Sequence, residues 1–357
     1  MDKKARISNP QVFAVEVATK FGLETFNLGN RRYLGGKSKL LEFIDGHLRG
    51  IIKRTPESVF DVFAGTGVVA DYYASKGSSV IANDLLQHNY LGLQTFLSPQ
   101  SIDIYKVAEK LLHLQNLKPH VNYFSKNFGG TYFSMRNSKF IGTVREEIEL
   151  IADSPREKAA LITSLVYAAD RVANTVGHYD AFHRGSDNRN EITLKLPNLS
   201  QYQHPKNKIF NMDSLELAPE VSTEVAYLDP PYNSRQYSDT YHLLENLASW
   251  SKPEVFGVAR KFDRTELKSD FCGIRAPQVF DELVQTINAE IILVSYSNNS
   301  NKLNMRSNAA IPDEIITKSL KARGSVSVKE IDFGVFTTGK TSKAGHKERL
   351  FVCKVKR

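Results

Sequence analysis

Two spacings of apolar residues alternate in the first part of the chain, and they predict different elements. Residues 38–48 have apolar side chains at helical spacing and predict an amphipathic helix. A short apolar run at 59–63 predicts a strand, which a tight turn at 64–67 joins to a helix that ends near Ser75. A second short strand follows and ends at Asp84. Strand, helix and strand in this order form a β-α-β unit, which favours a parallel sheet.

A different pattern runs through residues 91–206, where amphipathic helical segments dominate. Residues 101–115 and 154–174 are such segments, and polar stretches rich in aromatic residues lie between and after them. Strand-like runs then resume, and the last two, which flank a basic loop, predict a terminal β-hairpin. The chain is therefore expected to be an α/β protein. Residues 1–90 and 207–357 would form one sheet domain, and residues 91–206 an inserted, mainly helical lobe.

The composition is that of an ordinary globular protein with an excess of basic residues. Lys and Arg together number 47 against 39 Asp and Glu, which gives a formal net charge of +8. A modest excess of this kind suits a polyanionic partner without establishing one. The two cysteines, Cys272 and Cys353, are far apart and predict neither a zinc cluster nor a disulfide framework. Neither a secretory signal nor a run long enough to span a membrane is evident, so we expect a cytoplasmic protein.

The tight turn belongs to the segment DVFAGTG, residues 61–67, and an acid follows it at the end of the next strand. A glycine-rich turn between a strand and a helix lets a ligand approach the backbone closely. An acid about twenty residues further along, here Asp84, suits hydrogen bonding to ribose hydroxyls. The segment lacks the third glycine of the dinucleotide fingerprint, so a nucleoside with a small tail fits better than a pyrophosphate. A turn that only packs the helix on the sheet is the alternative.

A carboxylate, two prolines and an aromatic ring stand at the end of a later strand, in AYLDPPYNSRQY, residues 226–237. The exocyclic amine of a base is a poor nucleophile because its lone pair is delocalised into the ring. Two acceptors aimed at its N–H groups, the Asp229 carboxylate and the Pro230 carbonyl, would favour the reactive pyramidal nitrogen. Pro230 and Pro231 would stiffen the loop, and Tyr232 would offer a face on which the base stacks. A base in a duplex must be flipped out to reach such a pocket, whereas in the alternative interpretation Asp229 is a surface acid in a simple turn.

Together, DVFAGTG, the Asp84 that ends the next strand and DPPY at 229–232 resemble the signatures of adenine-specific amino-methyltransferases. YLGGKSKLL, residues 33–41, resembles the block that precedes the glycine motif in the Dam-like alpha group of this family. The order of lysine loop, glycine turn, long insertion and DPPY is also similar to the alpha group, whose insertion is the target-recognition domain. The resemblance covers about 30–90 and 207–300. It implies a Rossmann-like methyltransferase sheet that binds S-adenosylmethionine.

The resemblance also implies a set of residues around S-adenosylmethionine. Those of the glycine turn would surround the cofactor, and Asp84 would hold its ribose. Asp213 would contact the adenine of the cofactor, while Tyr33 and Lys37 would lie near its methionine carboxylate, with which a lysine can pair. A solvated Lys37 near the start of a helix is the alternative. The complete set is Tyr33, Lys37, Asp61, Ala64, Gly65, Gly67, Asp84 and Asp213.

Basic and aromatic side chains in two segments suit contact with nucleic acid. The segment after DPPY carries Arg235 and Gln236, followed by a run at 241–250 that also fits a packed amphipathic helix. The insertion contributes four candidates: His178, Tyr179, Arg184 and Arg189. An ordinary exposed loop is the alternative for these four residues. The histidines of this region are irregularly spaced and no cysteine joins them, so we expect no metal site.

These features favour a site-specific DNA adenine-N6 methyltransferase that transfers a methyl group from S-adenosylmethionine to a flipped-out adenine. No nuclease signature stands out, so a restriction endonuclease acting on the same site of double-stranded DNA would be a separate chain. We expect such a protein in a bacterial cytoplasm. The alternatives are an RNA adenine methyltransferase and a catalytically inert nucleic-acid-binding protein of the same fold. The intact glycine turn and DPPY segment argue against the inert protein.

Overall fold

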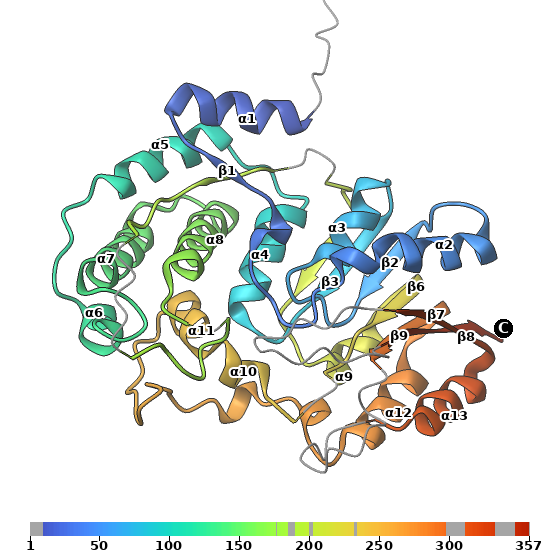
Figure 1. Ribbon diagram of the computed structural model, residues 1–357. Coiled ribbons are helices and arrows are strands. Elements are labelled where there is room, and N and C mark those ends of the chain that lie inside the picture. Colours follow the sequence, from blue (N-terminus) through green and yellow to red (C-terminus); the bar gives the residue numbers. More distant parts are fainter. Residues whose placement is uncertain are drawn as a thin grey trace, which may run out of the picture.

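The structure is a computed structural model of the chain (Figure 1). It describes residues 10–175, 177–184, 190–199, 203–231, 234–297, 311–332 and 347–356. These residues form a central β-sheet with helices on both faces and, to one side of it, a lobe made of helices (Figure 1). The α/β arrangement predicted from the apolar pattern is confirmed.

The central sheet has seven strands within the described ranges, in the order β5-β3-β2-β6-β7-β9-β8. They are β2 (Ser58–Asp61), β3 (Ser79–Asn83), β5 (Lys208–Phe210), β6 (Ser222–Leu228), β7 (Asn288–Ser297), β8 (Gly324–Asp332) and β9 (Lys347–Val355). The first five in spatial order are parallel, whereas β9 is antiparallel to both β7 and β8. The chain builds outward in opposite directions from β2, first to β3 and later to β6. Ligands of open α/β sheets bind at such a switch point, beyond the carboxyl ends of the strands.

Alternate residues of the parallel strands face two separate apolar cores. Val225 and Tyr227 of β6 belong to the core that also contains buried residues of α2 (Leu41–Ile52) and α3 (Val68–Ser75). Ala226 and Leu228 belong to the other core, together with residues of α12 (Ala276–Thr286) and α13 (Asp313–Arg323). A strand buried on both faces reads as a continuous apolar run, which is why β6 and β7 are recognisable in the sequence.

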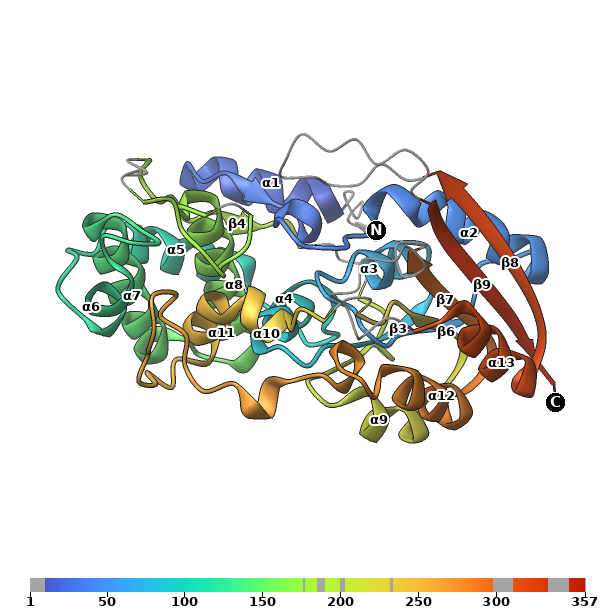
Figure 2. The same cartoon turned by 60° about the horizontal axis from the view of Figure 1, so that its bottom comes forward.

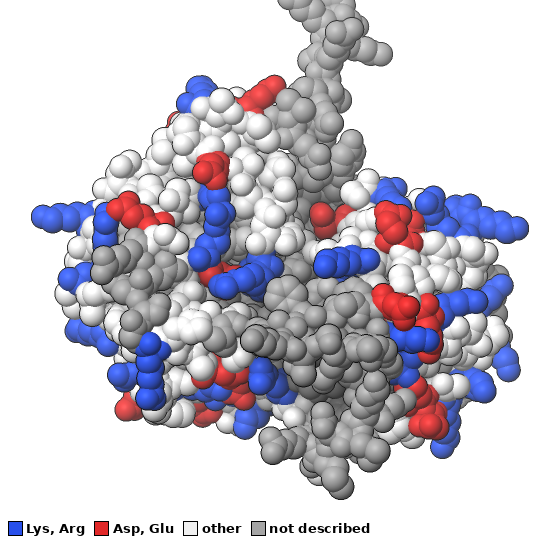
Figure 3. All heavy atoms as spheres, viewed as in Figure 1, with Lys and Arg blue, Asp and Glu red and all other residues white. Residues whose placement is uncertain are grey.

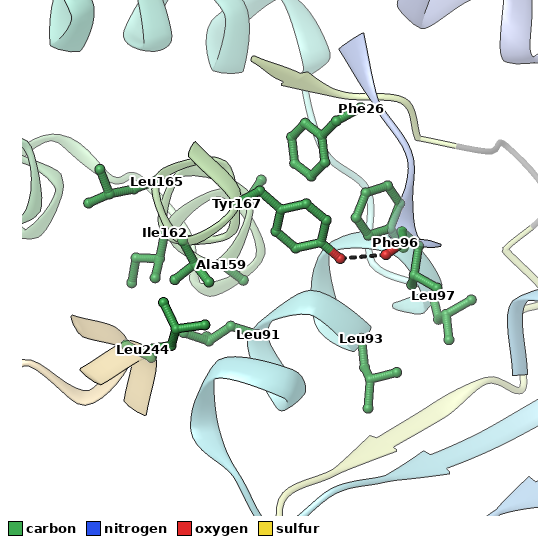
Figure 4. Close-up of a cluster of buried hydrophobic side chains, with 14 of the residues drawn as sticks. Phe26, Leu91, Leu93, Phe96, Leu97, Ala159, Ile162, Leu165, Tyr167 and Leu244 are labelled. Carbon is green, nitrogen blue, oxygen red and sulfur yellow. Dashed lines mark hydrogen bonds between the residues drawn. The ribbon is translucent and has the colours of Figure 1, made fainter. Parts of the chain in front are cut away.

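The helical lobe is built around a shared apolar core (Figure 4). Its helices are α4 (Gln87–Leu97), α5 (Ile104–Gln115), α6 (Tyr123–Phe128), α7 (Met135–Ile151), α8 (Pro155–Val172) and α11 (His242–Ser249). Leu91 of α4, Ile162 of α8 and Leu244 of α11 point toward one another in this core (Figure 4). The α11 helix thus packs with the lobe although it lies outside residues 91–206, whose identity as a recognition domain stays a prediction. Tyr167 joins the lobe to the N-terminal segment, since its hydroxyl donates to the Leu28 carbonyl (2.5 Å).

Smaller elements complete the fold. They are α1 (Pro10–Phe21), α9 (Ser214–Leu217), α10 (Tyr237–Thr240), the parallel pair of β1 (Thr25–Phe26) and β4 (Leu196–Pro197), and 3-10 turns at Leu28–Asn30, Ser38–Leu40, Ala218–Glu220, Thr265–Leu267 and Asp270–Cys272. The predicted terminal hairpin corresponds to the antiparallel pair β8 and β9. The helix predicted at 38–48 begins as a 3-10 turn and continues as α2. Within the described part of the chain, no helix is both long and apolar enough to cross a membrane.

Candidate active site

Three acids stand where neighbouring parallel strands end. Asp61 is the last residue of β2, Asp84 follows β3 directly, and Asp229 follows β6. Because β2 pairs with both β3 and β6, the three carboxylates gather at one edge of the sheet. This edge is the topological switch point, so the acids singled out in the sequence come together where a ligand is expected.

The glycine turn between β2 and α3 adopts a backbone that requires glycine at two positions. Gly65 has φ of +55° and Gly67 has φ of +84°, in the left-handed region that favours glycine. A Cβ atom at Gly65 would lie 2.7 Å from Cε1 of Tyr33, and one at Gly67 would lie 2.5 Å from Cδ2 of Leu93. The Gly65 N–H donates to Oδ2 of Asp84 (2.8 Å). The turn is thus packed closely against Tyr33 and Leu93 and is tied to Asp84 by one hydrogen bond.

Two cavities open on this edge of the sheet and share Tyr33, Phe63 and Asp229 in their walls. The first has apolar walls and polar groups that suit a nucleoside, namely Phe63, Asp84, Leu85, Met212, Asp213 and Pro231. The second lies against the glycine turn and includes Gly35, Lys37, Asp61, Ala64, Gly65 and Thr66. A nucleoside cavity joined to a smaller charged cavity matches the shape of a nucleoside that carries an amino-acid tail, and Asp229 lies where the two meet.

Asp84 combines a structural role with capacity for a ligand. Its Oδ1 accepts from Leu86 N–H (2.9 Å) and from Nδ2 of Asn89 (3.0 Å). With the Gly65 N–H this makes three hydrogen bonds, which leaves acceptor capacity on a carboxylate that lines the cavity. Burial raises the pKa of the Asp84 carboxyl to about 6, against the opposing effect of these hydrogen bonds, so the group is ionised at neutral pH.

Asp61 is buried and only partly satisfied. Its Oδ2 accepts from the Ala70 N–H (3.2 Å), whereas its Oδ1 has no hydrogen-bond partner among the described residues. Burial raises the pKa of the Asp61 carboxyl to about 8. An unpaired carboxylate in a closed cavity is costly unless a cation completes it. The Asp61 side chain therefore suits an ammonium group, such as that of an amino-acid tail.

Asp229 forms an ion pair that the sequence does not reveal. Nζ of Lys37 lies 2.8 Å from Oδ2 of Asp229 and 3.5 Å from Oε1 of Glu348, and it donates to the Gly35 carbonyl (3.0 Å). Lys37 is buried, so the alternative of a solvated lysine is wrong, and the Asp229 side chain is only 17% exposed, which excludes a surface acid. Burial raises the pKa of Asp229, and the Lys37 ammonium opposes that rise. One buried cation thus lies between two carboxylates.

Aromatic rings fix the loop that carries Lys37. Tyr33 stacks on Tyr241, with ring centroids 5.0 Å apart and an angle of 9° between the planes. The Tyr241 hydroxyl accepts from the Leu34 N–H (2.8 Å), and Tyr241 itself is buried. This supports the packing interpretation for the run at 241–250, in which His242 is also buried. The loop before α2 is therefore held against the segment that follows DPPY.

The remaining predicted site residues differ in how the structure places them. Asp213 lines the nucleoside cavity and also caps α9, where its Oδ1 accepts from the Leu215 N–H (2.8 Å). Pro231 lines the same cavity, and Pro230 joins it to Asp229. Tyr232 lies outside the described residues.

The six predicted nucleic-acid contacts also fall into different groups. Arg184 is exposed, Arg235 is about half exposed, and His178 is partly exposed. Gln236 lines the nucleoside cavity but uses its amide to hold Ser269, as donor to the carbonyl (3.0 Å) and acceptor from the N–H (2.8 Å). The Tyr179 side chain is buried, so the prediction that it contacts nucleic acid is wrong. Arg189 lies outside the described residues.

The hydroxyl of Tyr179 can be buried because it has a hydrogen-bond partner inside the protein. It donates to Oδ1 of Asp170 (2.9 Å), and the residue is 1% exposed.

In the part of the chain that the structure describes, no group of three or more His, Cys, Asp and Glu side chains is placed to hold a metal ion.

Sequence reasoning missed three residues that support the site. Asn89 bridges Asp84 and Arg31, because its amide donates to Oδ1 of Asp84 and accepts from the Arg31 guanidinium. Glu348 reaches the site from β9, far from the other acids in sequence. No spacing rule links these residues to the glycine turn or to DPPY. Asn89 lies five residues after Asp84, in the first turn of α4, but this spacing is not a signal in itself.

Comparison with known proteins gives a consistent family. The family model described as D12 class N6 adenine-specific DNA methyltransferase matches residues 33–297. Modification methylase StsI of Streptococcus sanguinis is 31% identical over 87% of this chain and 50% of its own length. Type II methyltransferase M.FokI of Planomicrobium okeanokoites is 29% identical over 82% of this chain and 47% of its own length. Type II methyltransferase M.NlaIII of Neisseria lactamica is 30% identical over 74% of this chain and 83% of its own length. The chain thus spans about half the length of the first two relatives and most of the third.

Proposed function

The chain belongs to the D12 class of N6 adenine-specific DNA methyltransferases, and from this we propose that it transfers a methyl group from S-adenosylmethionine to N6 of adenine in double-stranded DNA. The observation that carries the proposal is the meeting of the nucleoside cavity and the charged cavity at Asp229. The two cavities that suit the methyl donor lie beside the Asp229 carboxylate, which would hold the target amine. A transfer between two bound molecules requires such proximity.

The residues present fit the cofactor in four respects. Asp61 offers an unpartnered buried oxygen to the methionine ammonium, and Asp84 offers acceptor capacity to the ribose. Ala64, Gly65 and Thr66 of the glycine turn line the smaller cavity, where the tail would lie. Asp213, Met212 and Phe63 would enclose the adenine of the cofactor. S-adenosylmethionine supplies an electrophilic methyl group on a sulfonium.

The chain's own contribution to the reaction lies at Asp229 and the prolines after it. The Asp229 carboxylate and the Pro230 carbonyl would accept hydrogen bonds from the two N–H groups of the target amine. These hydrogen bonds would draw the nitrogen lone pair out of conjugation and direct it at the methyl group. They would also stabilise the positive charge that develops on the nitrogen in the transition state. Pro230 and Pro231 restrict the loop, and Tyr232 would stack on the base that leaves the duplex. Lys37 would keep Asp229 ionised and oriented.

The relatives are named as modification methylases and Type II methyltransferases. The chain would thus protect a specific DNA site from a restriction endonuclease carried by another chain, in a bacterial cytoplasm. The inserted residues 91–206 would contribute the recognition of that site.

Transfer of a labelled methyl group in vitro tests the activity. Purified protein with labelled S-adenosylmethionine should label duplex DNA that contains many sequences, with the label recovered as N6-methyladenine. RNA of the same sequences should stay unlabelled. Label in the RNA alone would favour an RNA methyltransferase, and label in neither, with S-adenosylmethionine bound, would favour an inert nucleic-acid-binding protein.

A further inference from the structure

The chain between α11 and α12 forms a narrow turn with exposed apolar side chains. Phe256 and Lys261 pair through two backbone hydrogen bonds, N–H to carbonyl, of 2.8 and 3.1 Å. We call residues 256–261 the Phe256 turn. Phe256 is 56% exposed and Val258 is 68% exposed, with Gly257 between them at φ of +70°. Large apolar side chains held in water at the end of a turn suggest that the turn acts on something outside the molecule.

The Phe256 turn is also fixed from the inside of the lobe. The carbonyl of Ala259 accepts from the Tyr132 hydroxyl (3.0 Å) and lies 2.9 Å from Nε2 of His242, and both of these side chains are fully buried. Upstream of the turn, the Pro253 carbonyl accepts from the Tyr123 hydroxyl (2.6 Å). Because buried groups hold the backbone on both sides, the exposed tip rests on a stiff support.

The same turn is tied to the segment that follows DPPY. Nζ of Lys261 lies 2.8 Å from Asp180 and 3.3 Å from Asp239, and the Arg264 guanidinium lies 2.8 Å from Asp239. Asp180 in turn lies 3.7 Å from Arg235, six residues after Asp229. These ion pairs join the predicted recognition loop, the α10 helix and the Phe256 turn.

The chain then runs from the turn into the wall of the active site. The segment between α11 and α12 passes along one edge of the molecule, from the lobe to the sheet domain (Figure 2). Leu267 and Ser269, a few residues beyond the turn, line the nucleoside cavity. The ion pairs of Lys261 hold the turn beside the segment that follows DPPY, and Asp229 of DPPY would hold the target amine.

We propose that the Phe256 turn inserts into duplex DNA beside the target adenine and that Phe256, with Val258, fills the space that the flipped base leaves. Proteins that distort DNA insert apolar wedges of this kind between bases, and flipping the target costs unstacking that a wedge offsets. Arg260 is exposed at the tip and has no ion pair among the described residues, so it is free to approach a phosphate. Two apolar side chains are too few for the core of a stable protein interface, which argues against a protein partner here.

The inference rests on the proposed function, and the test separates the two. Methylation-sensitive sequencing first identifies the site that the protein modifies, and a short duplex with that site becomes the probe. A second duplex is identical except that the target adenine lies opposite an abasic position and is already unpaired. The variants are Phe256→Ala and, as a matched control, Leu150→Ala, since Leu150 is an apolar residue 80% exposed at the end of α7.

We expect Phe256→Ala to lower the methylation rate on the paired duplex by at least about 10-fold. On the unpaired duplex the rate should return to within about 3-fold of the parent, because the wedge is no longer needed. Leu150→Ala should match the parent on both duplexes, and S-adenosylhomocysteine binding should be unchanged in both variants.

Other results would overturn the inference in distinguishable ways. A parent protein that methylates no DNA removes the proposed function itself. If the parent is active and Phe256→Ala methylates the paired duplex at the same rate, the turn has no role in base flipping. Contact with a protein partner would then be the alternative role for the turn. An equal loss on both duplexes would place Phe256 in general DNA binding or folding and would contradict a wedge.

Discussion

Lys37 is the residue whose role the structure changes most. The resemblance places it near the methionine carboxylate, whereas the structure pairs its ammonium with Asp229 and Glu348. Both roles use the same charge, but they affect different measurements. A group that binds the cofactor changes the KM for S-adenosylmethionine, whereas a group that keeps Asp229 ionised changes the pH at which activity falls.

We therefore predict a shifted pH profile for Lys37→Met. Burial raises the pKa of Asp229 and the Lys37 ammonium lowers it, so removal of the ammonium lets that pKa rise further. The protonated acid is a poorer acceptor, so the acid limb of kcat/KM should move upward by about one pH unit. Lys39→Met, two residues away and exposed, is the control and should leave the limb in place. An unmoved limb together with a raised KM for the cofactor would return Lys37 to the methionine carboxylate.

Asp61 gives a prediction for stability. Burial raises the pKa of its carboxyl from 3.8 to about 8, so the folded state holds the proton more tightly than the unfolded state. Its contribution to stability is full below pH 4 and is lost as the pH rises toward 8. Asp61→Asn removes the charge that must be buried, so without cofactor it should be more stable by at least about 1 kcal/mol at pH 8.

The advantage of Asp61→Asn should shrink between pH 8 and pH 5, which serves as the internal control in thermal unfolding. The same variant should bind S-adenosylhomocysteine more weakly, because the carboxylate that suits the ammonium is gone. A variant less stable than the parent at pH 8 would show that Asp61 is already neutralised by a partner.

The sequence identifies the site residues that lie at the ends of strands. It does not identify the residues that reach the site only through tertiary packing. Asp61, Asp84 and Asp229 follow strands, so their meeting could be expected from the parallel sheet alone. Glu348 reaches Lys37 only because β9 inserts antiparallel beside β7, which no spacing in the sequence specifies. Tyr179 fits the composition of an interface, but its hydroxyl has Asp170 as an internal partner.

Among the elements, the turn from β2 to α3 has the strictest requirements. The parallel strands of the central sheet were predictable because their two faces are apolar, whereas the short pair of β1 and β4 was not predicted. The sequence pattern did not distinguish the 3-10 turn at Ser38–Leu40 from the helix that follows it. The glycines of the turn were predictable, although their close neighbours were not.

Gly65→Ala tests that turn. The added methyl group would require a left-handed backbone and would lie 2.7 Å from the Tyr33 ring, which is itself stacked on Tyr241. We expect a loss of about 1–3 kcal/mol in stability and at least about 10-fold weaker S-adenosylhomocysteine binding. Gly46→Ala, in the middle of α2 with nothing within 4 Å, is the matched control and should be neutral or stabilising by about 0.5–1 kcal/mol. Calorimetric titration that shows parent-like affinity for Gly65→Ala would contradict the proposed path of the cofactor along the turn.

The whole molecule joins the lobe and the sheet domain through one continuous apolar core. Residues of α4, α8 and α11 belong to the same core as Val225 of β6, so the lobe is packed against the catalytic part rather than tethered to it. A sequence pattern that changes at residue 91 marks where helices begin, but it does not show that α11 returns to the lobe. Lysines and arginines are interspersed with acids over the face shown in Figure 3, so net charge alone does not locate the DNA.

Arg184 provides a test of where DNA lies on the molecule. It is exposed in the predicted recognition segment, and most protein–DNA hydrogen bonds go to phosphates. Arg184→Ala should therefore weaken binding to cognate and scrambled duplexes about equally and lower the salt slope by roughly one unit. Loss at the cognate duplex only would instead indicate a contact to a base edge. The control is Lys321→Ala on α13, which should behave as the parent; identical curves for all three proteins would place the interface elsewhere.

The central claim is that this chain methylates adenine in DNA through Asp229. Methylation-sensitive sequencing of DNA from cells that express either the parent or Asp229→Ala tests it most directly. The account predicts N6-methyladenine at one short sequence with the parent and none with the variant, although the variant should still bind S-adenosylhomocysteine within a few-fold of the parent. DNA without N6-methyladenine in cells that contain folded parent protein, or equal methylation with Asp229→Ala, would contradict it.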